Sequence, residues 1–450
     1  MTRTQSLQSV AVIGGGSSGL AVCKALKAEN SFLQIQNYTE EFRSASNVPS
    51  VDPFKEEPPY ILKDDKPIFY TPIYKHLNTD ISNGLIKFNN FPYPKGTDLF
   101  PSRQNVLKYI QSYGEGLREH ISLNSQIISA KKLDCGMWEL TVRHLDQGCK
   151  RTTHFFDAII IATNKYDTPF IPDVLGLKAW SKVYSDSITH SKYFIDNKPY
   201  EGKRVLVIGN SASGIDLASQ IADTAESVYR SIRSESKMAY SIETRVSDVA
   251  TVQSYDVETK TIFLNDGTVL KDIDSIVYCT GYMFSLPYMK SYFDGKNAII
   301  TTGGRLNKIY KQIFYIPDPT LAFVGMSTRV IPFPTAETQG AVIARVLSGR
   351  LELPNQTEML ESENEEEKER GSGSEFHELP YPLDIEYINS LQAWTNQAEP
   401  KDVGLHSEIW TEDMIDLRVN SFEYKKQHLS KKLGITVPPI KEVEPFKSLL

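Results

Sequence analysis

The sequence has few cysteines, no concentrated positive charge and no long apolar run, and each absence excludes a class of protein. Its four cysteines, Cys23, Cys135, Cys149 and Cys279, lie far apart and show neither metal-ligand spacing nor a CxxC pair. We therefore predict a reducing, cytoplasmic location and no metal site. The net charge of −7 and the lack of any Lys/Arg run argue against nucleic acid as a partner.

No stretch approaches the ~18 apolar residues that a membrane-spanning helix needs. Residues 1–9 lead into a first strand without the apolar core of a signal peptide. Peripheral attachment to a membrane surface, such as that of the endoplasmic reticulum, stays open, and so does the oligomeric state. Because 450 residues exceed the usual reach of one hydrophobic core, we expect two domains.

Two segments of the chain repeat the same order of strand, glycine turn and helix. Residues 10–13 are a short β-branched run that meets Gly14 abruptly, and residues 20–29 have the composition of a helix. The same order recurs where residues 204–208 run into a second glycine-rich turn followed by an amphipathic stretch at residues 215–222. Two such openings predict an α/β fold with two nucleotide-binding units.

Other segments indicate how the rest of the chain is organised. Residues 157–162 and 276–279 are apolar runs that each end in a small polar turn, which is typical of buried parallel strands. Residues 356–378 are rich in Glu, Ser and Gly, and we expect a solvated acidic loop there. Helical patterns at residues 385–397 and 412–429 predict a C-terminal helical cap.

The first glycine-rich turn matches the spacing that binds a pyrophosphate. Such a loop needs one glycine for the tight turn, a second so that the backbone can approach the phosphates, and a third for packing of the helix on the strand. Gly14, Gly16 and Gly19 supply these, with Ser17 and Ser18 between them. The alternative is a tight strand–helix turn without a ligand, but the strand–turn–helix context favours a nucleotide site.

The second turn carries Gly209, Ser211, Ser213 and Gly214, with serine in place of the middle glycine. Serine is still small enough for a phosphate to approach. The strand that follows ends in Arg230 and Arg233, and no acidic residue stands where a ribose diol would be held. Arginines there suit a 2′-phosphate, so we predict NADPH rather than NADH. The alternative is that both arginines are ordinary surface charges.

Together these residues resemble the flavin-containing monooxygenases, and in particular their fungal, thiol-specific type. The resemblance covers most of the chain and is more specific than any one glycine motif. The matching stretches are Phe100-Pro-Ser-Arg103, residues 157–163, residues 202–209, Cys279-Thr-Gly-Tyr282, residues 313–325 and residues 331–339.

The resemblance implies two Rossmann-like domains, with an NADPH domain inserted into a discontinuous FAD domain. The corresponding division is residues 1–170, 171–282 and 283–450. In that family NADPH reduces the flavin, dioxygen adds to it, and the flavin hydroperoxide oxygenates a small nitrogen or sulfur nucleophile. No protein side chain need act as a nucleophile, which fits the absence of a Ser/His/Asp or Cys/His arrangement in this sequence.

The resemblance also implies site residues outside the glycine turns. Thr79 and Asp80 match a Thr-Asn pair beside the flavin, which makes Asp80 the candidate catalytic residue. Further candidates for cofactor binding are Arg103, Asp216, Glu337 and Gln339, the last two on a helix that begins after Pro332-Phe-Pro334. For Glu337 and Gln339 the alternative is an ordinary helix start.

Two departures from the family pattern concern the flavin site. After Gln36 the family has an acid on the adenosine ribose and a Gly-Gly-x-Trp segment, but here roughly a dozen residues are missing around the expected acid. Glu40 is the candidate replacement, with Glu41 as the alternative. At Asp80 a carboxylate stands where the family has an amide, and an ionised carboxylate only accepts hydrogen bonds.

These departures leave a second hypothesis open, a catalytically impaired relative that keeps the fold and the NADPH site but binds FAD poorly. A gene-model error is a third explanation for the missing segment. A flavin disulfide reductase would need a redox-active cysteine pair, which this sequence lacks. Baeyer–Villiger and N-hydroxylating relatives remain open on motifs alone.

Overall fold

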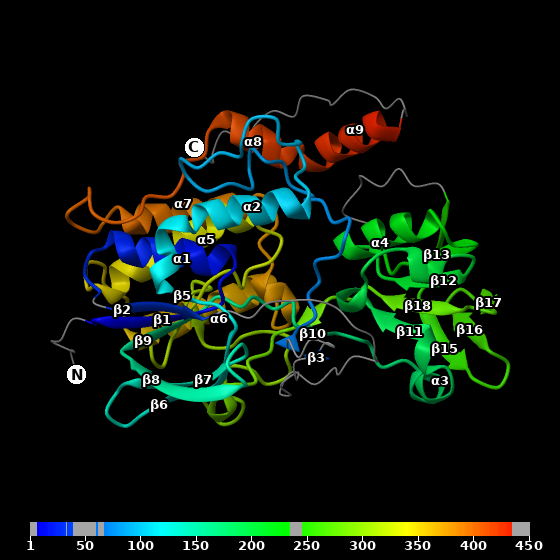
Figure 1. Ribbon diagram of the computed structural model, residues 1–450, viewed down its shortest axis with the longest axis horizontal. Coiled ribbons are helices and arrows are strands. Elements are labelled where there is room, and N and C mark those ends of the chain that lie inside the picture. Colours follow the sequence, from blue (N-terminus) through cyan, green and yellow to red (C-terminus); the bar gives the residue numbers. More distant parts are fainter. Residues whose placement is uncertain (1–6, 33, 39–59, 62–66, 235–244, 434–450) are drawn as a thin grey trace.

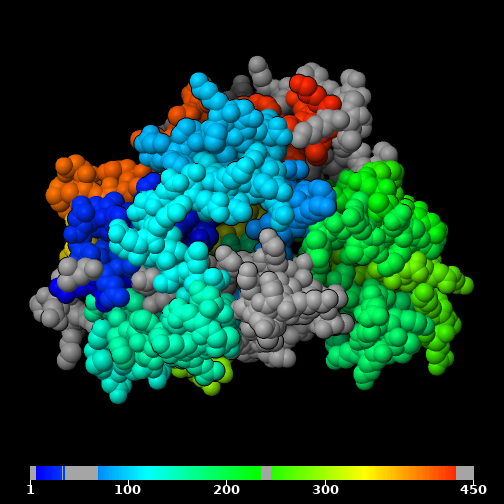
Figure 2. Space-filling view, in the orientation of Figure 1, coloured from blue at the N-terminus to red at the C-terminus, as the bar shows by residue number. Residues whose placement is uncertain are grey.

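A computed structural model describes residues 7–32, 34–38, 60–61, 67–234 and 245–433. It contains two lobes, each built on a parallel sheet, with a long C-terminal part packed on the first (Figure 1). Figure 2 shows the second lobe as the green part of the surface, beside the blue and cyan part of the first. None of the described helices combines the length and apolar composition needed to cross a membrane.

The first sheet draws strands from both halves of the chain. Five neighbouring strands run parallel and the last two pair antiparallel at one edge. In sheet order the strands are β20 (Ile309–Tyr310), β21 (Phe314–Tyr315), β22 (Leu321–Phe323), β9 (Ala158–Ile161), β1 (Ser9–Ile13), β2 (Gln34–Tyr38) and β5 (Ile121–Ser122).

Alternate residues of β1 show how this sheet is covered on both faces. Val10 and Val12 pack with helices on one side, whereas Ala11 and Ile13 pack with an antiparallel meander on the other. The helices are α1 (Ser17–Ala28), α2 (Arg103–Tyr113), α5 (Pro332–Leu347) and α7 (Leu383–Thr395); the meander is β6 (Ser125–Lys132), β7 (Trp138–His144) and β8 (Lys150–Phe156). Burial on both faces explains why β1 and β9 read as continuous apolar runs.

The second sheet is parallel throughout and is also covered on two faces. Its order is β11 (Ile188–His190), β18 (Ser275–Tyr278), β12 (Arg204–Ile208), β13 (Ser227–Ser231) and β14 (Val246–Val249). Helix α4 (Ala212–Ala222) lies on one face, and the other packs against β15 (Val252–Asp256), β16 (Thr261–Leu264) and β17 (Val269–Lys271). The two buried parallel strands predicted from residues 157–162 and 276–279 are therefore confirmed as β9 and β18.

The chain enters and leaves the second lobe at adjacent points. Just after β9, the short strand β10 (Thr168–Pro169) pairs antiparallel with β19 (Tyr282–Met283), which follows β18. This pairing is what an inserted domain requires, because the outgoing and returning connections must lie side by side. The division at residues 170 and 282 stays a prediction.

The prediction of a solvated acidic loop at residues 356–378 was wrong, because most of this segment is helix α6 (Gln356–Arg370). Asn355 caps the helix in a capping box with its third residue. Arg305 bridges to Glu363, which is buried, at 3.1 Å. Glutamate is a good helix former, and the composition argument did not anticipate the arginine and the cap that hold this run in place.

The predicted C-terminal helical cap is present. Its first helix is α7, and its second predicted helix is divided at Asn420 into α8 (Glu412–Val419) and α9 (Ser421–Leu433). Helix α9 lies above the junction between the two lobes (Figure 1). The short strands β3 (Tyr60–Ile61) and β4 (Pro67–Ile68), the helix α3 (Leu177–Val183) and six 3-10 turns complete the elements of the described residues.

Candidate functional site

The first glycine turn is held tightly between two parallel strands. Gly14 has a φ of +110°, and a Cβ there would lie 2.6 Å from the carbonyl oxygen of Ala162 at the end of β9. Any other residue at this position would be strained and would collide with backbone. Gly14 therefore fixes the path of the chain from β1 into α1.

Among the described residues, nothing requires glycine at position 16. Gly16 is the N-cap of α1, it is exposed, and a Cβ there would meet no atom of these residues within 4 Å. The N-cap residue makes no side-chain cap hydrogen bond to the first amide N–H groups of α1. A helix N-terminus of this kind is chemically suited to an anion.

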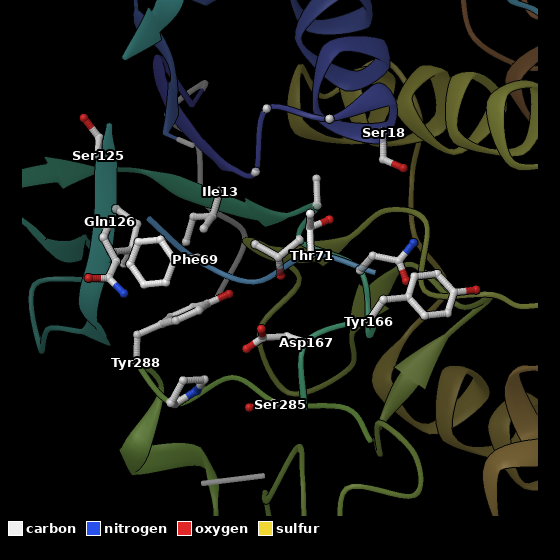
Figure 3. A pocket seen from close by; sticks show the side chains of 18 of the residues that line it. Ile13, Ser18, Phe69, Thr71, Ser125, Gln126, Tyr166, Asp167, Ser285 and Tyr288 are labelled. Atoms are coloured by element: carbon white, nitrogen blue, oxygen red, sulfur yellow. The ribbon is translucent and has the colours of Figure 1, made fainter. Parts of the chain in front are cut away.

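A cavity of about 340 Å³ opens from this turn. Figure 3 shows Phe69, Thr71 and Tyr288 turned toward one another inside it, with Gln126 on one side and Tyr166 on the other. The lining residues are 13–18, 69–72, 125–128, 162–164, 166–167, 285 and 287–288. The lining combines apolar and aromatic side chains with many polar ones, a mixture that suits a cofactor with both flat rings and phosphates.

Asp167 brings a carboxylate to this cavity, and the sequence reasoning missed it. Its Oδ1 lies 2.8 Å from the Nζ of Lys192, whose side chain is 1% exposed, whereas that of Asp167 is 57% exposed. The lysine comes from the turn after β11, so it ties the second lobe to the rim of the cavity. No local motif marks this pair, because its members lie 25 residues apart and meet only in the fold.

The second glycine turn repeats the packing of the first. Gly209 has a φ of +117°, and a Cβ there would lie 2.5 Å from the carbonyl oxygen of Cys279. A Cβ on Gly214 would lie 2.0 Å from the carbonyl oxygen of Gly209, so the turn must close on itself without side chains. Ser211 is the exposed N-cap of α4 and Ser213 lies in its first turn. The second turn thus also leads into a helix N-terminus of the kind that suits an anion chemically.

Comparison with known proteins decides the family. The family model of flavin-binding monooxygenase-like proteins matches residues 7–251 and 239–403. The chain belongs to this family. The thiol-specific monooxygenase of Saccharomyces cerevisiae is 30% identical over 434 residues, which are 93% of this chain and 92% of that protein. The flavin-containing monooxygenase ustF2 of Aspergillus flavus is 28% identical over 80% of both chains.

Solved structures of similar fold support the same architecture. The S-allyl-L-cysteine S-oxygenase of Allium sativum superimposes with a TM-score of 0.74 at 22% identity, over 94% of this chain and 95% of that one. Tmm from Pelagibacter has a TM-score of 0.70 at 20% identity, over 95% and 90%. The predicted α/β class with two Rossmann-type domains is confirmed. Membership of a flavin-binding monooxygenase family implies a flavin, a small-molecule substrate and dioxygen.

In this member of the family the two arginines after β13 have different surroundings. Arg230 makes a bidentate pair with Asp248 of β14, with its Nε 2.7 Å from Oδ1 and its Nη2 2.9 Å from Oδ2. Its side chain is mostly buried. Arg233 is exposed and has no ion pair with any residue in the described ranges. Of the two candidates for a 2′-phosphate, Arg233 is thus the one whose guanidinium faces solvent.

Thr79 and Asp80 do not line the cavity at the first turn. Thr79 donates its hydroxyl to the carbonyl of Ile81 at 2.8 Å, and Asp80 Oδ1 lies 3.6 Å from the Nζ of Lys425 in α9. The lysine therefore offsets the negative charge that distinguishes Asp80 from the family amide. Arg103 starts α2, and its buried Nε has no hydrogen-bond partner among the described residues, so a donor is available there for a ligand.

Glu337 and Gln339 are buried in the predicted helix, α5, which begins at Pro332 itself and not after Pro334. The Glu337 carboxylate accepts hydrogen bonds from the Asn89 N–H at 2.9 Å and the Tyr113 hydroxyl at 3.3 Å. Burial raises the pKa of Glu337 to about 7, although the two hydrogen bonds act in the opposite direction and lower it. Gln339 accepts from the Gly325 N–H at 2.9 Å. Neither side chain lines the cavity, so both join α5 to its neighbours.

Helix α5 matters to the first turn through packing. A Cβ on Gly340 would lie 3.0 Å from the Cα of Val22, so the backbones of α5 and α1 lie close together.

Two predicted site residues remain. Glu40, the candidate ribose-binding acid, lies outside the described residues. Asp216 lies in α4, where it accepts hydrogen bonds from the Tyr74 hydroxyl and from Gln220 Nε2.

Proposed function

We propose that the chain is an NADPH- and FAD-dependent monooxygenase that oxygenates soft sulfur or nitrogen nucleophiles, with thiols as the preferred class. The thiol preference is supported by the likeness to the thiol-specific monooxygenase of Saccharomyces cerevisiae, which extends over nearly the whole of both chains. The observation that carries the proposal is the pair of glycine turns, each of which leads from a parallel strand into a helix whose N-cap residue is exposed and makes no side-chain cap hydrogen bond.

The first turn suits the pyrophosphate of FAD. The space in front of Gly16 leaves room for a phosphate to reach the amides of α1, and the aromatic residues Phe69 and Tyr288 suit flat rings. When it is bound and reduced, the flavin would provide the chemistry that activates dioxygen. Residues around the cavity contribute by binding the cofactor, orienting it and excluding water.

The second turn suits the pyrophosphate of NADPH. The N-terminus of α4 faces outward at Ser211, and Arg233 is exposed after the neighbouring strand β13, where a 2′-phosphate would be held. Arg230 supports this edge of the sheet through Asp248. In a Rossmann-type sheet a nucleotide lies across the carboxyl ends of the strands, so both glycine turns are at the expected edge.

The test is oxidation of NADPH by the full-length protein loaded with FAD. We expect NADPH and oxygen to be consumed together when a small thiol is added, with lower rates for tertiary amines. A chain that keeps the NADPH site but is impaired at the flavin would bind NADP⁺ and would be colourless once unbound FAD is removed after loading. That result would replace the proposed function by the impaired alternative.

A further inference from the structure

Residues 69–80, called here the crossing segment, touch both lobes and the C-terminal helices. At one end, residues 69–72 line the cavity at the first glycine turn. Figure 1 shows this blue segment running between the first lobe and the second. Farther along, the Lys75 N–H donates to the Ile195 carbonyl at 3.0 Å, so its backbone is bonded to the second lobe.

Tyr74 anchors the middle of the crossing segment in the second lobe. Its ring is 5% exposed, meets Phe194 edge-on at 5.5 Å between centroids, and belongs to the apolar cluster that includes Leu217 of α4. Its hydroxyl donates to Asp216 Oδ2. Asp216 stands two residues after Gly214, so this bond reaches the helix that follows the second glycine turn, just beyond the first turn of that helix.

Asp216 needs the partner that Tyr74 provides. Burial raises the pKa of the Asp216 carboxyl, and the nearby Asp80 adds to that rise, while Tyr74, Gln220 and Lys425 oppose it. Tyr74 supplies one of two side-chain hydrogen bonds, the other being from Gln220 Nε2, that oppose the cost of burying this carboxyl. The Tyr74 hydroxyl therefore stabilises the contact between the crossing segment and α4.

Lys425 of α9 holds the far end of the crossing segment. Its side chain is 6% exposed, its Nζ donates to the Thr79 carbonyl, and it lies 3.6 Å from Asp80 Oδ1. A lysine so deeply buried is held by these acceptors. The crossing segment is thus fixed at Tyr74 to the second lobe and at Thr79 to the C-terminal helices.

We propose that Tyr74 is a positioning residue that makes binding of FAD at the first glycine turn and of NADP⁺ at the second interdependent. A ligand in the cavity contacts residues 69–72, and the crossing segment is bonded through Tyr74 to α4, so binding at the first turn affects the position of the helix at the second turn. The inference rests on the proposed function, because it requires both nucleotides to bind.

The test compares NADP⁺ affinity in FAD-free and FAD-loaded full-length protein by isothermal titration calorimetry. For the unaltered chain we expect FAD to lower the Kd of NADP⁺ by about fivefold or more, a typical coupling between two sites. Tyr74→Phe, which removes only the hydroxyl, should reduce that effect to roughly twofold or less. Lys425→Met, a second variant at the other anchor, should weaken the coupling in the same direction.

Tyr424→Phe is the matched control. The Tyr424 hydroxyl donates to Asp416 Oδ2 at 2.9 Å, so the variant removes the same type of bond, but within the C-terminal helices. It should keep the full coupling. If the unaltered chain binds both nucleotides independently, or if Tyr74→Phe keeps the full effect of FAD, the inference is overturned while the proposed function stands. If the unaltered chain binds neither nucleotide, both are overturned.

Discussion

The two glycine turns share their packing but differ in their middle position. At Gly14 and Gly209 a Cβ would collide with a carbonyl oxygen of the neighbouring parallel strand, so the protein itself requires glycine there. Gly16 and Ser211 are both exposed N-caps that make no side-chain cap hydrogen bond. The fold thus requires glycine at the first position, whereas we propose that a ligand sets the middle one, and substitutions at the two should have different consequences.

The largest effect is expected from Gly14→Ala and Gly209→Ala. Each puts a side chain in the left-handed region and against backbone, at a cost of about 3 kcal/mol, or roughly 100-fold in affinity. Gly14→Ala should lose FAD and keep NADP⁺, and Gly209→Ala should do the reverse. Separate titrations with each nucleotide measure this. Loss of both nucleotides in each variant would show that the turns are not separate sites.

A second substitution tests the helix that supports the first turn. Glu337 in α5 has a pKa raised to about 7 from its ordinary 4.5. The folded protein thus holds this proton more tightly than the unfolded chain does. Its contribution to stability, roughly 3 kcal/mol at most, is present below pH 4.5 and is lost as the pH rises to 7. Between pH 4.5 and pH 7, the melting temperature of Glu337→Gln should fall less than that of the unaltered chain. An equal fall in both proteins would contradict the raised pKa of Glu337.

Gly16→Ala separates ligand binding from folding. The new methyl group meets no atom of the residues that the structure describes, so the melting temperature should be unchanged. FAD should bind about tenfold more weakly, because the methyl group would occupy the approach of the phosphate. Gly116→Ala is the control, since its Cβ also meets nothing and it lies in a 3-10 turn away from the cavity. Unaltered FAD affinity in Gly16→Ala would place the phosphate elsewhere.

The smallest effect concerns selection of the second nucleotide. Arg233→Gln should lower the ratio of kcat/KM for NADPH over NADH by about fivefold, as loss of a charge-assisted bond to an exposed phosphate implies. Arg230→Gln should lower the melting temperature instead, since it breaks the pair with Asp248. If Arg230→Gln alone changes the NADPH preference, the roles of the two arginines are exchanged.

Local sequence was sufficient to predict the parts of the fold that depend on local rules. The glycine spacing, the β-branched runs and the proline start of α5 predicted two turns, the strands β9 and β18 and a helix in the right place. Composition misjudged α6, because what orders its acidic run is Arg305, more than 50 residues earlier in the chain. Long-range partners of this kind are not visible in a local pattern.

The site residues follow the same division. Gly14, Gly16 and the second turn were predicted from spacing, whereas Asp167 was missed because its partner Lys192 reaches it only through the fold. Sequence could not distinguish Arg230 from Arg233, since the difference lies in Asp248 on the adjacent strand. Candidate site residues that depend on local backbone geometry can therefore be proposed from the sequence. Those whose surroundings depend on contacts between distant segments cannot.

The central claim is that one chain holds two nucleotides in two separate sites. The most direct measurement is an equilibrium titration of the full-length protein, with FAD followed by its absorption spectrum and NADP⁺ by calorimetry. The account predicts one FAD and one NADP⁺ bound at the same time to each chain. Displacement of FAD by NADP⁺, or a protein that binds only one of the two, would contradict it.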